Sequence, residues 1–202
     1  MLQISLSDNM DLTQGTEKEK HDRAKKMMLW FGIVSLLMSF AGWTSAFVVS
    51  SSREDWLDGF KLPSAFTVSV VLIILSSVAF ILAKHALKSG NRPQTTTFLI
   101  VTLGLGIGFI VTQLVGFQQI IELGYNFTGP TSNITMSYIY IIAAVHILHV
   151  AVGLICLLVV IYNHFKQKYS AENMLGFELA ANFWHFVDIL WLYLFLFLFF
   201  MS

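Results

Sequence analysis

The sequence has little charge, few prolines and almost no cysteine. Only 12% of its 202 residues are charged, whereas soluble domains average about 25%. Lys plus Arg equals Asp plus Glu, so the formal net charge is zero and no basic surface for nucleic acid is expected. The one cysteine, Cys156, cannot form a disulfide within the chain. We interpret it as a small packing residue.

Apolar residues are abundant, and they gather into long runs. They make up 56% of the chain and form five blocks, each near or above the roughly 20 residues that cross a bilayer. The blocks are Met27–Val49, Pro63–Leu87, Thr96–Leu123, Met136–Tyr162 and Ala180–Met201. These blocks are too continuous for the alternating strands of a membrane barrel. The sequence predicts an all-α membrane protein, with a polar tail in residues 1–26 and a bundle of five transmembrane helices in residues 27–202.

The basic residues are distributed unequally between the segments that connect these blocks. Ten Lys and Arg residues fall in the N-terminal tail and in the second and fourth connections. Only Arg53 and Lys61 fall in the first connection, and none follows in the third or at the C-terminus. Because cytoplasmic segments carry the excess of Lys and Arg, we expect a cytoplasmic N-terminus and a periplasmic C-terminus. The first block is full length and lacks a small-residue cleavage site, so we interpret it as a retained span.

Small and polar residues recur at three-, four- or seven-residue steps within the first four blocks. Such periods place them on single helix faces, where small residues let neighbouring helices approach closely. We therefore expect these faces to point toward neighbouring helices. The clearest sets are Ser35, Ser39, Gly42 and Ala46; Ser69, Ser76 and Ala83; Gly104, Gly108, Thr112, Gly116, Gln119 and Glu122; and Ala143, His146, His149, Gly153 and Cys156.

The fifth block contains two ionisable residues, His185 and Asp188, one helical turn apart. An Asp near the centre of a span costs roughly 2.5–3.5 kcal/mol on insertion scales, unless it faces inward and is paired. We predict that the imidazole donates to the carboxylate and that Trp184 and Trp191 shield the pair. A proton-conducting pair and a contact with a partner subunit or a lipid head group are the alternatives.

Haem or metal ligation is the other chemistry that the histidines suggest. His146 and His149 lie three residues apart on one predicted helix, whereas haem ligation by two histidines needs ligands from two sides. His185 lies nearer the cytoplasmic end, and no carboxylate–histidine set repeats at di-iron spacing. We therefore predict no metal or haem site in this chain. Glu178, at the start of the fifth block, suits either the helix N-terminus or a partner contact.

Four stretches resemble conserved elements of one known family, and one of them is "HALKSGNR", residues 85–92, which resembles a loop between two of the family's helices. "GFELAANFWHFVDILWLYLF", residues 176–195, strongly resembles the C-terminal signature of subunit III of haem–copper cytochrome c oxidases. "VHILHVAVGL" from Val145 and "QQIIELG" from Gln118 resemble two further elements of that family, in the same order. The matching positions, which we expect to form a structural or interface network, are Gln119, Glu122, His146, His149, Glu178, Trp184, His185, Asp188 and Trp191.

The chain also departs from the family pattern. It has five predicted spans, like the shorter bacterial members, where the full-length family has seven. Ile147 replaces the family's glycine between the two histidines, and Leu36 stands where many members carry a membrane-embedded Glu. A role of that carboxylate in proton supply therefore does not transfer to this chain.

The resemblance implies a non-catalytic subunit of an aa3-type cytochrome c oxidase in the bacterial inner membrane. Such a subunit has no redox centre of its own, because haem and copper belong to the partner subunits I and II. It packs against subunit I, binds phospholipid, stabilises the complex and supports proton uptake, and a larger respiratory supercomplex is a further candidate partner. Subunit III of a quinol oxidase is the alternative, followed by a haem-carrying membrane cytochrome. A small transporter is less consistent with the sequence, which has no internal repeat.

Overall fold

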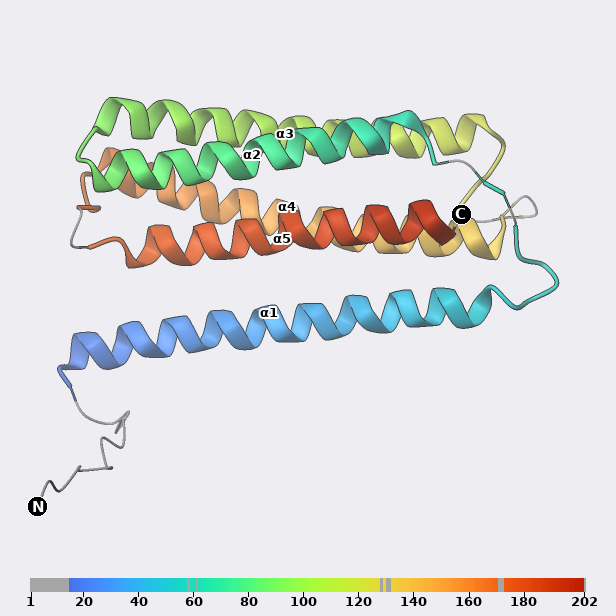
Figure 1. Cartoon of the computed structure of the whole chain (residues 1–202), viewed down its shortest axis with the longest axis horizontal. Coiled ribbons are helices and arrows are strands. Elements are labelled where there is room, and N and C mark those ends of the chain that lie inside the picture. The colour runs from blue at the N-terminus through green and yellow to red at the C-terminus, as the bar shows by residue number, and fades with distance from the viewer. Residues whose placement is uncertain are drawn as a thin grey trace, which may run out of the picture.

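Five long α-helices run the length of the molecule (Figure 1). The computed structural model describes residues 15–57, 59–60, 62–127, 129, 132–170 and 173–201. The helices within these ranges are α1 (Glu17–Ser50), α2 (Ser64–Lys88), α3 (Arg92–Glu122), α4 (Ile134–Phe165) and α5 (Leu175–Met201). Each of the five is long and apolar enough to cross a membrane, which confirms the predicted fold class.

The first helix begins well before its apolar block. Thr16 and Glu19 form a capping box, in which the Thr16 side chain accepts from the Glu19 amide and Glu19 Oε2 accepts from the Thr16 amide. This reciprocal pair satisfies two of the amides that a helix start leaves without partners. Residues 17–26, assigned to the tail from their polarity, therefore form the first turns of α1, and residues 1–14 lie outside the described part.

Two glycines end the helices that precede short turns. Gly90 and Gly124 have φ values of 73° and 90°, a left-handed conformation that costs glycine little. The amides that follow them, those of Asn91 and Tyr125, bond back to the carbonyls of Ala86 and Ile120. This arrangement ends α2 and α3 with satisfied carbonyls and lets the chain reverse direction.

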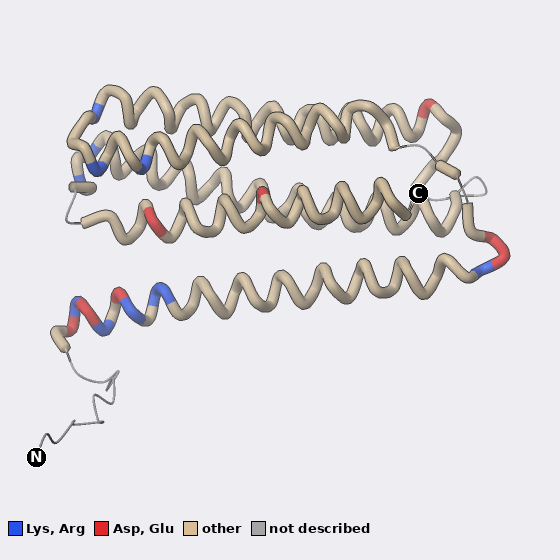
Figure 2. The backbone as a smooth tube through the Cα atoms, in the orientation of Figure 1, with Lys and Arg blue, Asp and Glu red and all other residues tan. Residues whose placement is uncertain are grey.

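Four of the helices form a closed bundle, and α1 lies along one side of it. Helix α2 packs against α3 and α5, and α4 packs against α3 and α5. Helix α1 packs against α4 and α5 (Figure 1). Lys and Arg residues gather at the end where α1, α3 and α5 begin, which we call the basic end (Figure 2).

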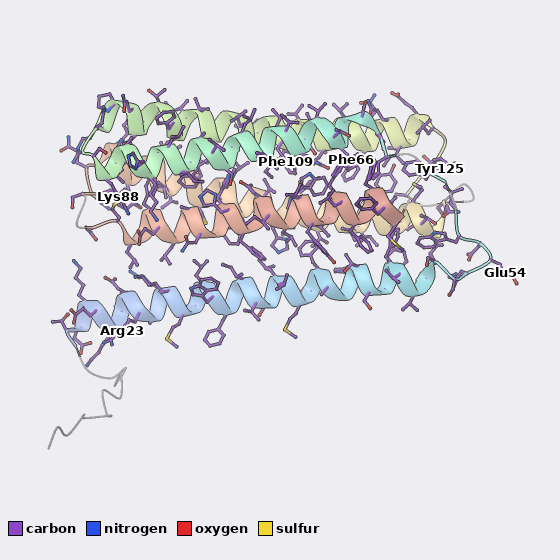
Figure 3. The ribbon with its side chains drawn as sticks, viewed as in Figure 1. Arg23, Glu54, Phe66, Lys88, Phe109 and Tyr125 are labelled. Atoms are coloured by element: carbon purple, nitrogen blue, oxygen red, sulfur yellow. The ribbon has the colours of Figure 1, made fainter. Side chains whose placement is uncertain are left out.

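The core is rich in aromatic rings. Phe66 of α2 and Phe109 of α3 point into the bundle (Figure 3), and both rings pack on Trp191 of α5. Nearer the basic end, Phe80 packs on Trp184. Large apolar side chains also cover much of the outer surface, as the lipid-facing side of a membrane bundle requires.

The predicted inward faces are right for α2 and wrong for α1. Ser69 and Ser76 are fully buried, as expected. Ser35, Ser39 and Gly42, in contrast, are exposed on the surface of the chain. Helix α1 instead turns its large residues toward the bundle, and its buried side chains are Ile33, Phe40, Thr44 and Phe47.

Candidate functional site: the polar ladder between α2 and α5

Helices α2 and α5 are joined by polar side chains at successive levels along their length. We call this set the polar ladder. On α2 it comprises Ser69, Ser76, Ser77 and Lys84, and on α5 it comprises Glu178, Trp184, His185, Asp188 and Trp191. Its bonded positions recur at about seven-residue steps on both helices, so the same two faces meet from one end of the contact to the other.

The lowest level, at the basic end, is an ion pair. Nζ of Lys84 lies 3.2 Å from Oε1 of Glu178, and both side chains are about one third exposed. Exposed ion pairs of this kind contribute little stability, about 0–1 kcal/mol. The pair therefore mainly fixes where Glu178 points at the start of α5.

Ser77 occupies the next level, between the two ionisable residues of α5. Its Oγ lies 2.6 Å from Nδ1 of His185, in a hydrogen bond, and the carboxyl group of Asp188 lies beside the same hydroxyl group. The predicted direct bond from His185 to Asp188 is not formed within the described part of the chain. Ser77, on a different helix, bridges the two groups instead.

Asp188 is almost completely buried, with 6% of its surface exposed. One of its oxygens, Oδ2, has no hydrogen-bond partner among the described residues. A buried polar atom without a partner costs about 1–3 kcal/mol, so the hydroxyl group of Ser77 beside Asp188 is the polar neighbour that offsets part of the cost of burying this group.

Trp184 is held at the same depth by a bond and by two glycines. Its Nε1 donates to Oγ of Ser76 over 3.0 Å. A Cβ added to Gly106 of α3 would lie 2.7 Å from the indole, and one added to Gly153 of α4 would lie 3.1 Å from it. The indole therefore fits only because both neighbouring helices carry glycine where it passes.

Trp191 forms the top level, in contact with three helices. Its Nε1 donates to Oγ of Ser69 over 3.1 Å, and Nε2 of Gln113 in α3 donates to the same oxygen over 2.8 Å. The indole also stacks on the ring of His146 in α4, with centroids 4.8 Å apart. Trp191 thus links α2, α4 and α5 in the middle of the core.

The two histidines of α4 have different surroundings. His146 is fully buried among Phe40, Phe109 and Trp191, and neither ring nitrogen has a hydrogen-bond partner in the described chain. His149 is partly buried, and its Nδ1 bonds the carbonyl of Val145 within the same helix. No hydrogen bond joins either histidine to the polar ladder.

Gln119 and Glu122 lie at the end of α3, at the opposite end of the bundle from the basic end. Glu122 is exposed and accepts from Gln118 over 3.2 Å. Gln119 is partly buried, and its Oε1 has no partner in the described part of the chain. Of the nine residues predicted to form a network, five therefore belong to the ladder and His146 touches it by stacking. The other three, His149, Gln119 and Glu122, are bonded elsewhere or not at all.

The ladder is suited to holding helices together. It contains one histidine and two carboxyl groups, and only one of these three groups is deeply buried. Within the described ranges, no group of three or more His, Cys, Asp or Glu residues is placed to hold a metal ion. The arrangement bonds polar atoms of α5 to side chains of α2, and one of these, Ser69, also accepts a hydrogen bond from Gln113 of α3.

Sequence reasoning missed most of the partner residues. Ser77, Lys84 and Gln113 were not singled out, although each bonds a residue of the ladder. The available signal was the seven-residue spacing of polar residues on α2, counted from position 77 as well as from position 76. The same spacing occurs on α5. The requirement for glycine at position 106 is evident only once Trp184 is known to pack against it.

The family model for cytochrome c oxidase subunit III matches residues 11–202 of the chain. The match includes all five helices and every ladder residue. It extends the likeness from separated motifs to nearly the whole sequence.

Individual relatives agree with this match. Cytochrome c oxidase subunit 3 of Pelomedusa subrufa is 32% identical over 174 residues, covering 81% of this chain and 64% of that protein. The corresponding protein of Spodoptera frugiperda is 31% identical over 138 residues, covering 68% of this chain and 87% of its own length. That of Drosophila melanogaster is 28% identical over 200 residues, covering 91% of this chain and 73% of its own length.

The chain thus spans about two thirds to three quarters of the length of the longer relatives it matches. Its five apolar helices and the extent of the family match make it a multi-pass membrane protein. The chain belongs to the cytochrome c oxidase subunit III family.

Proposed function

We propose that this chain is the non-catalytic subunit III of an aa3-type cytochrome c oxidase in an aerobic respiratory chain. In this role it packs against subunit I, stabilises the complex and supports proton uptake. Haem and copper reside in subunits I and II, and this chain supplies no redox centre.

The observation that carries the proposal is the coincidence of signature and structure on α5. The residues that match the family's C-terminal signature are Glu178, Trp184, His185, Asp188 and Trp191, and all five make ladder contacts. The residues of this signature therefore fix α5 to the bundle. Such use suits a subunit whose part in the complex is structural. The role in proton uptake rests on the family resemblance.

The proposal includes the setting of the chain. The gathering of Lys and Arg at one end of the bundle (Figure 2) supports a cytoplasmic N-terminus and a periplasmic C-terminus in a bacterial inner membrane. Phospholipid remains bound to the chain. Subunits I and II are the direct partners, and a larger respiratory supercomplex is a further assembly in which the chain takes part.

Purification under mild detergent tests the central claim. An affinity tag on this chain is expected to recover a large haem–copper subunit and a copper-carrying second subunit, with absorption bands of haem a. Mass spectrometry of the eluted polypeptides and a visible spectrum provide the readout. A control purification from the untagged strain measures background.

Two results would overturn the proposal. One is recovery of the tagged chain alone from membranes that contain an active oxidase. The other is a haem absorption band that stays with the chain after all other polypeptides have been removed, because it would assign the redox centre to this chain.

A further inference from the structure

Helix α1 is fixed to the bundle along its second half. Its buried side chains all lie from Ile33 onward. Near its end, Oγ1 of Thr44 lies 3.4 Å from the hydroxyl oxygen of Tyr193 in α5, and Oγ of Ser50 lies 2.9 Å from that of Tyr138 in α4, both in hydrogen bonds. The end of α1 that lies opposite the basic end is therefore held by packing and by hydrogen bonds.

The first half of α1 lies apart from the bundle. Residues 17–32 are exposed or partly exposed, and the labelled Arg23 of α1 lies away from Lys88 of α2 (Figure 3). An apolar hollow of about 440 Å³ lies between this half of α1 and helices α4 and α5, with Leu29 and Cys156 in its walls. A polar hollow of about 340 Å³ lies nearer the basic end. This half of α1 therefore has room to move toward the bundle.

The residues at which α1 bends most easily lie where its packing begins. Gly32 weakens the helix because it has no side chain, and nothing lies within 4 Å of a Cβ added to it. Ser35 and Ser39 follow, and Oγ of Ser39 donates to the carbonyl of Ser35 over 2.9 Å. A serine hydroxyl that bonds a carbonyl one turn back often bends a helix, and helices kink where Gly and Ser occur together. These small residues, which do not contact other helices, thus form a flexible segment.

Opposite charges line the polar hollow from its two sides. Asp22 belongs to α1 and Lys88 to the end of α2, and neither forms an ion pair with another described residue. Lys18 and Lys26 of α1 line the same hollow, as does Glu178 of α5, which is already paired with α2. Movement of α1 toward the bundle would bring Asp22 and Lys88 together. One exposed ion pair of this kind changes an equilibrium by at most about fivefold.

From these features we propose that the first half of α1 is a hinged arm, which bends between Gly32 and Ser39 and closes the apolar hollow. An ion pair between Asp22 and Lys88 holds the arm closed. The fixed second half of α1 is the pivot. Because one exposed ion pair is weak, both arrangements are populated, and salt or a charged neighbour at the basic end shifts the balance. The arm is a property of this chain, so the inference goes beyond the proposed function and does not depend on it.

Disulfide formation between Leu29→Cys and the native Cys156 measures closure. Both positions line the apolar hollow, and a disulfide needs Cα atoms within about 7 Å of each other. The full chain, with the subunits that accompany it, is reconstituted in vesicles and oxidised with copper phenanthroline. Mass spectrometry of peptides then follows the disulfide within the chain over time. We expect the Leu29→Cys protein to form this disulfide.

Variants of the ion pair and of the flexible segment change the rate in defined directions. In the Leu29→Cys protein, Asp22→Asn and Lys88→Gln should each slow the disulfide by up to about fivefold. The double reversal Asp22→Lys, Lys88→Asp should restore the rate. Gly32→Ala should also slow it, because alanine stiffens the helix and its Cβ meets no neighbour.

Two controls separate closure from general effects. Met28→Cys faces outward, with 73% of its wild-type side chain exposed, and should form no disulfide with Cys156. Lys25→Gln removes a charge of α1 outside the polar hollow and should leave the rate of the Leu29→Cys protein unchanged.

Two results would overturn the proposal. The absence of a disulfide between Leu29→Cys and Cys156 in the intact complex would show that the arm does not close. A rate that Asp22→Asn, Lys88→Gln and Gly32→Ala all leave unchanged would remove both the ion pair and the bend. Neither result bears on the recovery of partner subunits, so failure here is distinguishable from failure of the proposed function.

Discussion

Ser77 is the residue on which the buried polar groups of α5 most depend. Its hydroxyl group bonds His185 and lies beside the carboxyl group of Asp188. A serine can serve two groups because its hydroxyl is one donor and an acceptor with two lone pairs. The loss of this one oxygen leaves His185 without its hydrogen-bond partner and Asp188 without its neighbouring hydroxyl group.

We therefore predict that Ser77→Ala destabilises the chain by about 1–3 kcal/mol, because the ring of His185 loses its partner and the buried carboxyl group of Asp188 loses a polar neighbour. The measurement is the denaturant midpoint of the purified protein, followed by tryptophan fluorescence. Ser52→Ala is the matched control, since Ser52 is exposed and bonds a carbonyl one turn back in the chain. Equal midpoints for the two variants would contradict the assigned role of Ser77.

Two glycines of α3 provide a second test at this scale. We predict that Gly106→Ala destabilises the protein by about 1–3 kcal/mol, because its Cβ would meet the indole of Trp184 at 2.7 Å. Gly104→Ala is the control, because nothing lies within 4 Å of its added Cβ and alanine favours the helix by about 0.8–1 kcal/mol. The thermal midpoints of the two variants should shift in opposite directions; a shift of both in the same direction counts against the close packing of Trp184.

At the scale of elements, the α2–α5 contact depends on shared hydroxyl groups rather than on charge. The top level of the ladder illustrates this, since Ser69 accepts from both Trp191 and Gln113. Bonds of this kind between membrane helices average about 0.6 kcal/mol and reach about 1.7 kcal/mol. Several such bonds in series specify how the two helices align without a buried ion pair.

A double-mutant cycle on Ser69→Ala and Trp191→Phe measures one of these bonds. We expect a coupling energy of about 0.6–1.7 kcal/mol, with both variants destabilised singly. Unfolding free energies of the wild type, the two single variants and the double variant give the value. The same cycle on Ser69→Ala and Trp30→Phe should give no coupling, because Trp30 is exposed on α1. If the effects of Ser69→Ala and Trp191→Phe are strictly additive, the hydrogen bond between Ser69 and Trp191 does not contribute to stability.

The helices themselves could be predicted from the sequence, but their partners could not. Each apolar block coincides with one helix to within one residue at the ends that overrun it, Pro63 and Leu123, because the length of an apolar run and the thickness of a bilayer are enough to define a span. The choice of Ser77 as the partner of His185 and Asp188 depends on the rotation of α2 about its axis. The matching seven-residue steps indicate which faces of α2 and α5 meet, but the choice between Ser76 and Ser77 needs the rotation itself, and for this reason the pairing of His185 with Asp188 was predicted wrongly.

The face of α1 was missed for a related reason. Ser35, Ser39 and Gly42 have the spacing of a close helix contact, yet they point outward and Phe40 and Phe47 pack inward. Spacing identifies a face but does not say which neighbour meets it. Phe40 and Phe47 face inward because their rings make edge-on contacts with the rings of His146, Trp56 and Tyr138. Each aromatic pair of this kind contributes about 0.5–1.5 kcal/mol.

At the scale of the whole molecule, the two ends of the bundle differ in charge. This difference predicts the orientation of the bundle in the membrane. In a Cys156→Ser background, Ser89→Cys lies at the basic end and Ser52→Cys lies at the other end, and both positions are exposed. We expect a membrane-impermeant maleimide to label only Ser52→Cys in right-side-out vesicles, because basic segments stay in the cytoplasm. Inverted vesicles serve as the control, and the labelling should exchange there. Labelling of Ser89→Cys from the outside would reverse the proposed orientation.

Among the described helices, α1 packs against α4 and α5 alone, and this position also affects how the chain is made. Helix α1 is synthesised first, but α4 begins roughly 80 residues after α1 ends, which corresponds to roughly 4–16 s at ribosomal rates of about 5–20 residues per second. During that interval Phe40 and Phe47 have none of their final neighbours from α4 and α5, and lipid must solvate them. During biogenesis, α1 can therefore reach its final packing only after the C-terminal half of the chain has entered the bilayer and α4 and α5 have packed against it.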